Sequence, residues 1–528
     1  MKASSLLKLF TVSISAAFGI GFLAVRYPEN MPDNVEPKPA FARASDSSIR
    51  EIRSRLFSGP ISDIAAIDGL TIADMPEESQ IGIHARFNHD PEAVRMLLSA
   101  AGYKWLRSDR GDWATEGLVS ARNLDMNINL LVYAPGKMIL DKNLSMRDIA
   151  EFWHYEMVVA DINTYGDAIK SVQVHNEPAH FPKVEAKGAN GRKRKISAWL
   201  HAFGGKPWEG QWVDKFAEFS AYASELTKAD YPNIDVVIGA LNINATATMI
   251  EEYDQTFDVV YFHPYPARRK PEFFPGLPNE NYRNFNTEDI EFERTIDLFD
   301  EQVVFPRTQE KARFWVTEVG FSTYRKAIGV PDIPQPPTSE VMQGKLLARA
   351  LNTYFAAGVE RVFLFILNDT RSRNPARRSI NNKESNFGLV RRDYSLKPAY
   401  LMMARINLLT RGIMKPDVEL QRSTTIRSAT TANGGALLEG ERIRLVGFQT
   451  GIDRQMVSVW SDATTAESED TFEPRQVTLS FDPSQLGSNP ILFDVMTGQS
   501  RRLNPSVTEA GARVELEVPD YPLYIVEN

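Results

Sequence analysis

Cysteine is absent from the 528 residues of this chain, and histidine is scarce, with 7 residues. The lack of cysteine excludes disulfide bonds, thiolate nucleophiles and cysteine-ligated metals. The histidines show no His-x-x-x-His spacing, and no glycine-rich phosphate loop follows any predicted strand. We therefore expect no metal, no organic cofactor and no nucleic-acid partner. The hydrophobic content of 43% is enough for a large core and more than one domain.

Long hydrophobic runs are also missing, except at the amino terminus. Lys2 and Lys8 precede an uncharged stretch from Leu9 to Val25, and Arg26 ends it. As a helix this stretch would be about 25 Å long, short of a hydrocarbon thickness of ~30 Å but tolerable with local thinning. Residues 1–26 are thus predicted to be a signal anchor or a signal peptide. An uncleaved anchor is favoured, because no small-x-small cleavage site closely follows the stretch.

Either form of this segment exports the folded part of the chain. The two lysines favour an amino terminus that stays inside. We expect a protein that is membrane-anchored and faces the periplasm or cell exterior, or one that is secreted. Residues 27–64 are rich in Pro, Asp, Ser and Arg, and they read as a tether with one short helix near Ile49–Leu56.

A regular alternation of strands and amphipathic helices begins after the tether. Short apolar, β-branched runs predict eight strands, at residues 80–84, 104–107, 127–133, 171–174, 235–241, 259–265, 314–316 and 361–366. Stretches such as Trp212–Lys228 and Ser339–Ala357 have apolar residues at helical spacing. The pattern predicts a (β/α)8 TIM barrel over residues 65–411, with a doubly wound open sheet as the structural competitor.

The pattern changes in the last part of the chain. Short alternating runs, such as Val457–Trp460 and Val514–Val518, are separated by Gly, Asp and Pro turns. Residues 412–528 are therefore predicted to form an antiparallel β-sandwich domain. A free-standing carbohydrate-binding module is an alternative, but the link at Thr410–Pro416 has no flexible run, which favours a packed structural companion.

Two glutamates at predicted strand ends carry the functional signal. Glu177 lies in Val-His-Asn-Glu-Pro at the end of the fourth strand, and Glu318 lies in Trp-Val-Thr-Glu-Val-Gly at the end of the seventh, 141 residues later. Residues at the carboxyl ends of barrel strands face the active site of such barrels. Hydrolysis of a glycosidic bond with retention needs two carboxyl groups, one protonated and one ionised. The alternative is that both are solvated loop carboxylates.

The two motifs resemble clan A of the retaining glycoside hydrolases, and with the C-terminal domain the chain is most similar to family 39 and its relatives. The resemblance covers roughly residues 78–528 and implies that Glu177 is the acid/base and Glu318 the nucleophile. It also implies that Asn176 bonds the sugar 2-hydroxyl. One departure is strand 8, which lacks the tryptophan that many members carry: either Phe365 or Asn368 substitutes for it, or the sugar subsite has a different shape.

Further supporting roles follow from the same resemblance. Tyr265 resembles the tyrosine that holds the nucleophile, and His263 matches a histidine that faces the acid/base. Arg107 resembles an arginine beside the nucleophile, where a fixed cation would keep Glu318 ionised. His84 ends the first strand and is a weaker candidate. Tyr265 and His263 could instead be core residues, and Arg107 could form a surface bridge with Asp109 or Asp112.

The expected mechanism is double displacement on an oligo- or polysaccharide, with Glu177 kept protonated by desolvation and by the charge of Glu318. Two alternatives stay open: a non-catalytic polysaccharide-binding or biosynthesis-accessory protein, and a transglycosylase on the same fold. The substrate is expected to be anionic, since three loops at strand ends are basic. These loops contain Lys183, Lys187, Arg192, Lys193, Arg194 and Lys195, then Arg268, Arg269 and Lys270, and then Arg371, Arg373, Arg377, Arg378 and Lys383. Solvated loops and a patch for anionic lipids are the competing readings.

Overall fold

The computed structural model describes residues 46–110, 114–187, 193–207, 209–240, 243–253, 255–274, 291–326, 335–370, 380–508 and 511–528. Contacts divide the chain into residues 1–45 and a folded unit, residues 46–528. The predicted signal segment therefore lies outside the described residues. Among the described helices, none is both long enough and apolar enough to cross a membrane.

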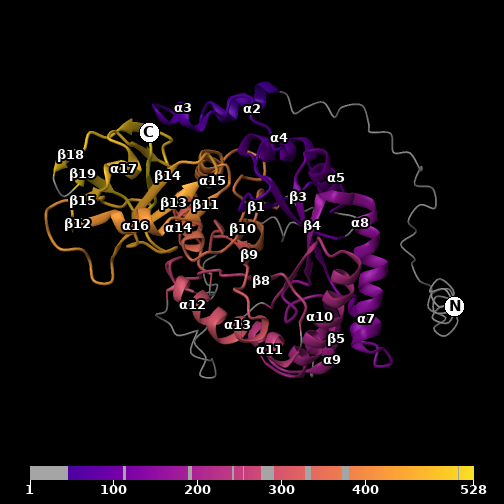
Figure 1. The fold of residues 1–528 in the computed structure, drawn as a ribbon. Coiled ribbons are helices and arrows are strands. Elements are labelled where there is room, and N and C mark those ends of the chain that lie inside the picture. Colours follow the sequence, from indigo (N-terminus) through magenta and orange to yellow (C-terminus); the bar gives the residue numbers. More distant parts are fainter. Residues whose placement is uncertain are drawn as a thin grey trace. The chain divides into compact units, whose positions relative to one another are not determined.

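A closed parallel barrel forms the first part of the folded unit (Figure 1). Its strands are β1 (Ile81–His84), β2 (Trp105–Asp109), β3 (Asn127–Val132), β4 (Ile169–Val174), β7 (Asp235–Ile238), β8 (Val259–Phe262), β9 (Phe314–Val319) and β10 (Arg361–Leu364). Around the barrel they follow the order β1-β2-β3-β4-β7-β8-β9-β10, and β10 closes on β1. Each of the eight predicted strands corresponds to one of them, so the predicted barrel is confirmed.

Helices cover the outside of the barrel. They include α4 (Pro91–Ala101), α5 (Thr115–Asn123), α7 (Met146–Phe152), α8 (Val159–Tyr165), α10 (Gln211–Asp230), α11 (Ile243–Glu252), α12 (Phe292–Phe299), α14 (Glu340–Ala356) and α15 (Pro398–Thr410). Their ends follow local chemistry: the Asp90 side chain accepts a hydrogen bond from the amide of Ala93 at the start of α4, and Gly102 ends that helix with φ 70°. Shorter helices are α6 (Gly136–Ile139), α9 (Ala198–Phe203) and α13 (Phe305–Thr308).

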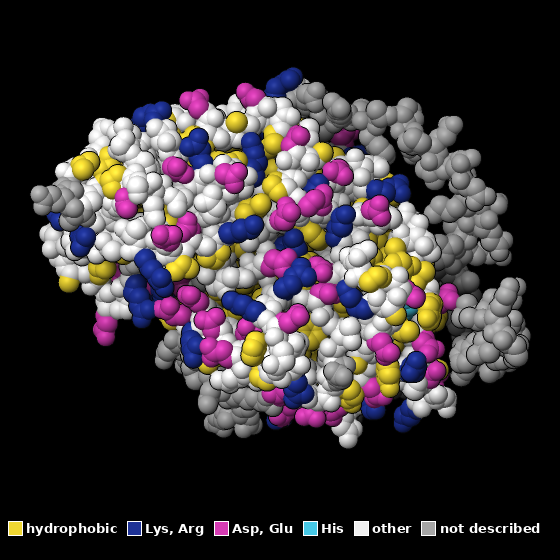
Figure 2. Space-filling view, in the orientation of Figure 1, with side chains coloured by type: hydrophobic (Ala, Val, Ile, Leu, Met, Phe, Trp, Pro, Cys, Tyr) yellow, Lys and Arg dark blue, Asp and Glu magenta, His cyan; other side chains and the backbone are white. Residues whose placement is uncertain are grey.

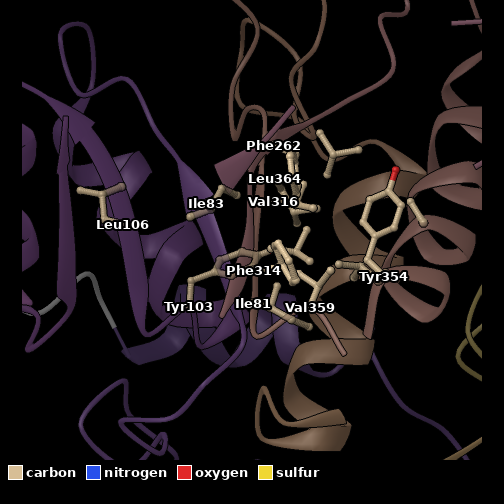
Figure 3. Close-up of a cluster of buried hydrophobic side chains, with 14 of the residues drawn as sticks. Ile81, Ile83, Tyr103, Leu106, Phe262, Phe314, Val316, Tyr354, Val359 and Leu364 are labelled. Atoms are coloured by element: carbon tan, nitrogen blue, oxygen red, sulfur yellow. The ribbon is translucent and has the colours of Figure 1, made fainter. Parts of the chain in front are cut away.

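The main core lies between strands and helices. Figure 3 shows Ile81, Ile83, Phe262 and Val316 from the strands gathered with Tyr354 of α14. All five are at most 2% exposed, and burial of each such side chain contributes roughly 1.5–3 kcal/mol. Alternate strand residues point into the barrel instead. There a separate cluster of Trp105, Val237, Val259, Tyr261, Trp315 and Phe363 fills one layer.

The C-terminal part is the predicted β-sandwich, built from two antiparallel sheets. One sheet has the order β11-β13-β14-β20-β16-β17 and the other β12-β15-β19-β18. The bounds are β11 (Met414–Pro416), β12 (Thr425–Thr430), β13 (Ile443–Thr450), β14 (Gln455–Ser461), β15 (Arg475–Phe481), β16 (Ile491–Asp494), β17 (Ser500–Arg502), β18 (Ser506–Thr508), β19 (Gly511–Val518) and β20 (Leu523–Val526). Helices α16 (Val418–Ser423) and α17 (Pro483–Leu486) connect them.

The sandwich packs on the barrel through buried polar contacts of α14. Arg349 of α14 forms an ion pair of 2.7 Å with Glu272, and it also donates to Thr464 of the sandwich domain at 2.9 Å. Lys345 pairs with Asp520 at 2.8 Å. Since these groups are almost fully buried, the sandwich packs directly on the barrel, as expected for a packed companion.

The predicted tether requires a correction for residues 46–64. Helices α2 (Asp46–Arg53) and α3 (Ile61–Ala65) belong to the folded unit, and α2 packs on α4. The guanidinium of Arg53 donates to the carbonyls of Ser99 and Ala100 at the end of α4, at 2.9 and 3.2 Å. Because carbonyls in the last turn of a helix lack the regular i+4 amide partners, Arg53 supplies donors to them and fixes the segment. The expected short helix is present as α2, but it packs on the outer helix α4 of the barrel and does not belong to a tether.

Candidate active site

Glu318 reaches the barrel interior because β9 contains an irregularity. Phe314 and Val316 face the outer core, so strict alternation would point Glu318 the same way. The pairing with β10 shifts at this place: Val316 lies opposite Val362, whereas Val319 lies opposite Leu364. One extra residue in β9 is a β-bulge, which re-aims the side chains beyond it. Thr317 and Glu318 can therefore both face the barrel interior.

Glu177 follows β4 in a strained turn. His175 and Glu177 have φ values of 71° and 43°, in the left-handed region that non-glycine residues rarely adopt. The nearby contacts hold this backbone in place: the amide of His175 donates to Val132 at 3.0 Å, and Gln173 donates to the His175 carbonyl at 3.0 Å. The turn places the Glu177 carboxyl over the barrel mouth.

The two carboxyl groups face each other across His263. The Nδ1 atom of His263 lies 2.9 Å from Oε1 of Glu177 and 3.8 Å from Oε2 of Glu318. One ligand atom from each of these three residues lies within 4.8 Å of the others. The two carboxyl oxygens are thus at most that far apart, which matches the close separation of retaining glycosidases, roughly 5–5.5 Å, and not that of inverting ones.

Arg107 joins the predicted site residues into one network. It is 1% exposed, and its Nη1 donates to Oε1 of Glu318 at 2.7 Å. Its Nε donates to Gln173 at 2.7 Å, and its Nη2 donates to Oδ1 of Asn176 at 2.8 Å. Burial acts to lower the pKa of Arg107, but the charges of Glu318 and Asp109 raise it above its ordinary value. Arg107 is a fixed buried cation here and does not form a surface bridge.

Tyr265 and His84 complete the surroundings of Glu318. The Tyr265 hydroxyl donates to Oε2 of Glu318 at 2.8 Å, and burial followed by the charge of Glu318 raises the pKa of Tyr265 well above its usual range. Nε2 of His84 lies 2.7 Å from Nη1 of Arg107, which can only donate. Burial and the charge of Arg107 lower the pKa of His84 well below its usual value, so this ring is neutral and accepts.

The electrostatics of Glu177 differ from the prediction. Burial acts to raise its pKa, but hydrogen bonds from His180 and His263 outweigh it, and the pKa of Glu177 is lowered. Nδ1 of His180 lies 3.2 Å from Oε2 of Glu177. The expectation that desolvation and Glu318 keep Glu177 protonated is therefore wrong for the unliganded protein, because two imidazoles stabilise the carboxylate. His180 was not among the predicted residues, although it stands three positions after Glu177.

The site opens into a cavity of about 1000 Å³. Six of the seven predicted site residues line it: His84, Arg107, Asn176, Glu177, Tyr265 and Glu318. His263 lies directly behind Glu177, and its Nε2 is 2.9 Å from the hydroxyl of Thr317. Phe365 lines the cavity, whereas Asn368 bonds the backbone of Arg86, so Phe365 occupies the place expected for an aromatic wall. Sequence reasoning missed Gln173 and Thr317, which lie within strands and show no motif.

The basic loops are not all at the cavity. Lys183, Lys195 and Lys383 line it. Arg268 instead pairs with Glu467, and Lys270 pairs with Asp462 at 3.0 Å. These two cations therefore bind acidic residues of the sandwich domain, and the prediction that they surround the cavity is wrong. The physical reason is that acidic sandwich residues are their nearest partners. The side chains of Lys187 and Arg192–Arg194 and the whole of Arg371–Arg378 lie outside the described residues.

The buried guanidinium of Arg107 disfavours metal binding at this site. Glu177, His263 and Glu318 form the one group within the described ranges whose ligand atoms lie close enough for a metal ion. Both oxygens of Glu318 already accept hydrogen bonds, from Arg107 and Tyr265. A divalent cation bound to Glu318 would lie next to a buried guanidinium, which Coulomb repulsion disfavours.

Comparisons with known proteins bear on the fold. No model of a known protein family matches the chain, and no curated protein matches it. A family 39 glycoside hydrolase from the gut symbiont Bacteroides cellulosilyticus WH2 is similar in structure, with a TM-score of 0.52 and 14% identity over 86% of this chain and 82% of that one. This likeness shows a shared fold and agrees with the resemblance of the two glutamate motifs to family 39.

Two further structures are more distant. A glucosidase from Croceicoccus marinus matches with a TM-score of 0.46 and 11% identity, over 85% of this chain and 95% of that one. The catalytic domain of a GH30 xylanase C from Talaromyces cellulolyticus matches with a TM-score of 0.46 and 11% identity, over 86% and 97%. With scores this low, neither adds to the assignment of the fold. The chemistry of this chain is therefore inferred from its site geometry.

Proposed function

We propose that this protein is a retaining glycoside hydrolase that cleaves glycosidic bonds of an oligo- or polysaccharide by double displacement. The observation that carries the proposal is the pair of carboxyl groups, Glu177 and Glu318, whose oxygens lie within 4.8 Å across one cavity. The pair sits at the carboxyl ends of barrel strands, where active sites of this fold lie.

In the first step, Glu318 attacks the anomeric carbon and the bond from that carbon to the leaving oxygen breaks. Arg107 and Tyr265 hold the two oxygens of Glu318 at 2.7 and 2.8 Å, so the nucleophile is fixed before substrate arrives. The leaving oxygen takes a proton from Glu177. In the second step, Glu177 removes a proton from water, the water oxygen attacks the anomeric carbon, and Glu318 is released.

For the first step, Glu177 must hold the proton that it gives to the leaving oxygen. In the unliganded protein, hydrogen bonds from His180 and His263 outweigh the effect of burial and lower the pKa of Glu177. The His180 side chain is 46% exposed at the cavity wall. A bound sugar that displaces water disfavours the ionised form of Glu177 and so favours its protonation.

Trapping of the intermediate tests this proposal. A 2-deoxy-2-fluoro glycoside with a dinitrophenyl leaving group should add one glycosyl mass to the wild type, on the peptide that contains Glu318. Glu318→Ala should show no labelling and no turnover, with kcat lower by at least ~10⁴-fold. Glu177→Ala should still be labelled and should be rescued by azide. Wild-type turnover in Glu318→Ala would contradict the proposal, and products made only with an acceptor sugar would identify a transglycosylase.

We also propose that the substrate carries negative charge. Lys183 and Lys195, on the hairpin β5 (Lys183–Lys187) and β6 (Lys193–Ser197), line the cavity with Arg86 and Lys383. Among the described residues, Lys195 has no ion-pair partner, although Glu185 lies opposite it in the hairpin. Figure 2 shows acidic and basic side chains interspersed on the face it draws, so the charge that supports this proposal is local to the cavity.

Export of the protein is a further part of the proposal. It rests on the sequence of residues 1–26, in which an apolar stretch lies between basic residues. A cell-surface or periplasmic location, membrane-anchored or secreted, suits an enzyme that acts on a polysaccharide too large to enter the cell.

A further inference from the structure

Two polar groups line the cavity that the proposed chemistry does not use: the carboxyl of Asp109 and the hydroxyl of Tyr133. Asp109 ends β2, and Tyr133 directly follows the neighbouring strand β3. Asp109 stands opposite Leu131 in the sheet. Alternation puts Asp109 on the same inner face as Arg107, two residues before it, and Tyr133 on the same face as Leu131. Both groups therefore lie at the barrel mouth.

Neither group has a hydrogen-bond or ion-pair partner among the described residues. Ser108 donates only to the main-chain carbonyl of Asp109. The Tyr133 ring is held edge-on by His175, with centroids 5.3 Å apart, and also contacts Phe181. Loss of water without a replacement partner is costly for a carboxyl group. Unused hydrogen-bonding groups on the wall of a cavity are what a ligand rich in hydroxyls requires.

The order of the barrel strands fixes which part of a sugar meets them. The shorter path around the barrel between the strands that carry Glu177 and Glu318 is the arc β4-β7-β8-β9, which also carries His263 and Tyr265. Asp109 and Tyr133 lie on the opposite, longer arc β9-β10-β1-β2-β3-β4. A sugar ring with its anomeric carbon between the two glutamates extends away from the short arc. Its ring hydroxyls then approach the wall formed by β2 and β3.

We infer that Asp109 and Tyr133 bind two neighbouring ring hydroxyls, away from the anomeric carbon, of the sugar whose bond is cleaved. This inference rests on the site of the proposed function. A carboxylate accepts hydrogen bonds from two adjacent hydroxyls, and the tyrosine hydroxyl donates to one of their oxygens. The substrate class is thus a sugar whose hydroxyls at these positions are free, and esterified, methylated or sulfated units are excluded.

Deoxygenated probes test the contact directly. The probes are 4-nitrophenyl β-D-glucoside, β-D-xyloside and β-D-glucuronide, each with its 3-deoxy and 4-deoxy analogue. With wild type, loss of a bound hydroxyl should lower kcat/KM by roughly 10- to 100-fold. Asp109→Asn and Tyr133→Phe should lower kcat/KM for the parent glycoside, and the deoxy penalty should shrink to less than about 3-fold, since the partner is already gone. An unchanged deoxy penalty in both variants would overturn the inference.

A matched control separates packing from recognition. Tyr103→Phe removes another buried tyrosine hydroxyl without a partner in the described structure, but from the outer core of the barrel. It should leave both kcat/KM and the deoxy penalty as in the wild type. The same effect in Tyr103→Phe as in Tyr133→Phe would show a structural role only and would overturn the assignment of Tyr133.

A binding experiment distinguishes failure of this inference from failure of the proposed function. The nine glycosides are titrated by calorimetry into Glu318→Gln and into Glu318→Gln/Asp109→Ala. The inference is supported if Glu318→Gln binds the deoxy analogues more weakly than the parent glycosides and the double variant shows no such difference. This holds even if the wild type hydrolyses none of the probes, in which case only the proposed function is contradicted. An equal deoxy penalty in both proteins, or no binding of any probe to Glu318→Gln, would overturn the inference.

Discussion

Asp109→Asn is predicted to make the protein more stable above pH 6. Burial, with the charge of Glu318 as a smaller contribution, raises the pKa of Asp109 to about 6, although Arg107 and Arg86 oppose the shift. An aspartate in an unfolded chain has a pKa near ~3.9. Between these two values the folded state binds more protons than the unfolded state, so the free energy of unfolding decreases as pH rises from about 4 through 6.

The size of the effect follows from the shift. About two pKa units correspond to roughly 3 kcal/mol of lost stability once Asp109 is fully ionised. Asparagine has the same shape and cannot ionise, so Asp109→Asn removes this loss. For a folded unit that spans residues 46–528, an unfolding entropy of about 2.1 cal/mol/K per residue gives roughly 1 kcal/mol per kelvin. We therefore expect the Tm difference between variant and wild type to increase by about 3 °C between pH 4 and pH 8.

Thermal unfolding followed by circular dichroism at pH 4, 5, 6, 7 and 8 measures this difference. Any constant effect of the amide cancels, because only the change with pH is compared. Asp453→Asn serves as control: it removes one exposed carboxylate in the turn after β13, at a φ of 53° that asparagine tolerates. A Tm difference that stays constant from pH 4 to 8, or one that decreases, would refute the reasoning.

Three other predictions test separate parts of the structure. His180→Ala removes a hydrogen bond that lowers the pKa of Glu177, so that pKa should rise and the alkaline limb of kcat/KM should move to higher pH; a limb that stays in place or moves to lower pH would contradict the role of His180 in setting the pKa of the proton donor. Lys195→Ser should lower kcat/KM for the glucuronide relative to the glucoside by roughly 3- to 10-fold at 20 mM salt and less at 150 mM, and Arg268→Ser, whose partner is Glu467 of the sandwich, serves as control; equal effects on both glycosides would reject the anionic substrate. Deletion of residues 1–26 should leave a soluble, folded enzyme in the cytoplasmic fraction, and fractionation of the truncated protein with membranes would contradict the export proposal.

Much of the architecture could be predicted from the sequence, because it depends on local patterns. Apolar, β-branched runs bounded by turns set each barrel strand, and their alternation with amphipathic stretches favours a parallel barrel. The same periodicity, with a period of two, gave the β-sandwich. Glu177 and Glu318 could be selected since a polar residue at the carboxyl end of a barrel strand has few structural reasons to be there.

The contacts that decide the chemistry come from residues far apart in the chain. The hydrogen bond from Arg107 to Glu318 joins residues of β2 and β9, and Lys270 meets Asp462 of another domain. No local pattern specifies such a partner. The resemblance to a known family correctly suggested a cation beside the nucleophile. The position of the cations after β8 in the sequence, by contrast, wrongly suggested that they line the cavity.

Local backbone geometry was the other contribution of the tertiary structure. Alternation in the sequence alone would point Glu318 outward with Phe314 and Val316, and only the pairing of β9 with β10 forces the bulge that allows it to turn inward. The left-handed turn at Glu177 brings its carboxyl to His180 and His263, which reverses the expected direction of its pKa shift. The sequence by itself determined which residue types stand at the strand ends, and the closed barrel decided their orientation, their partners and hence their protonation.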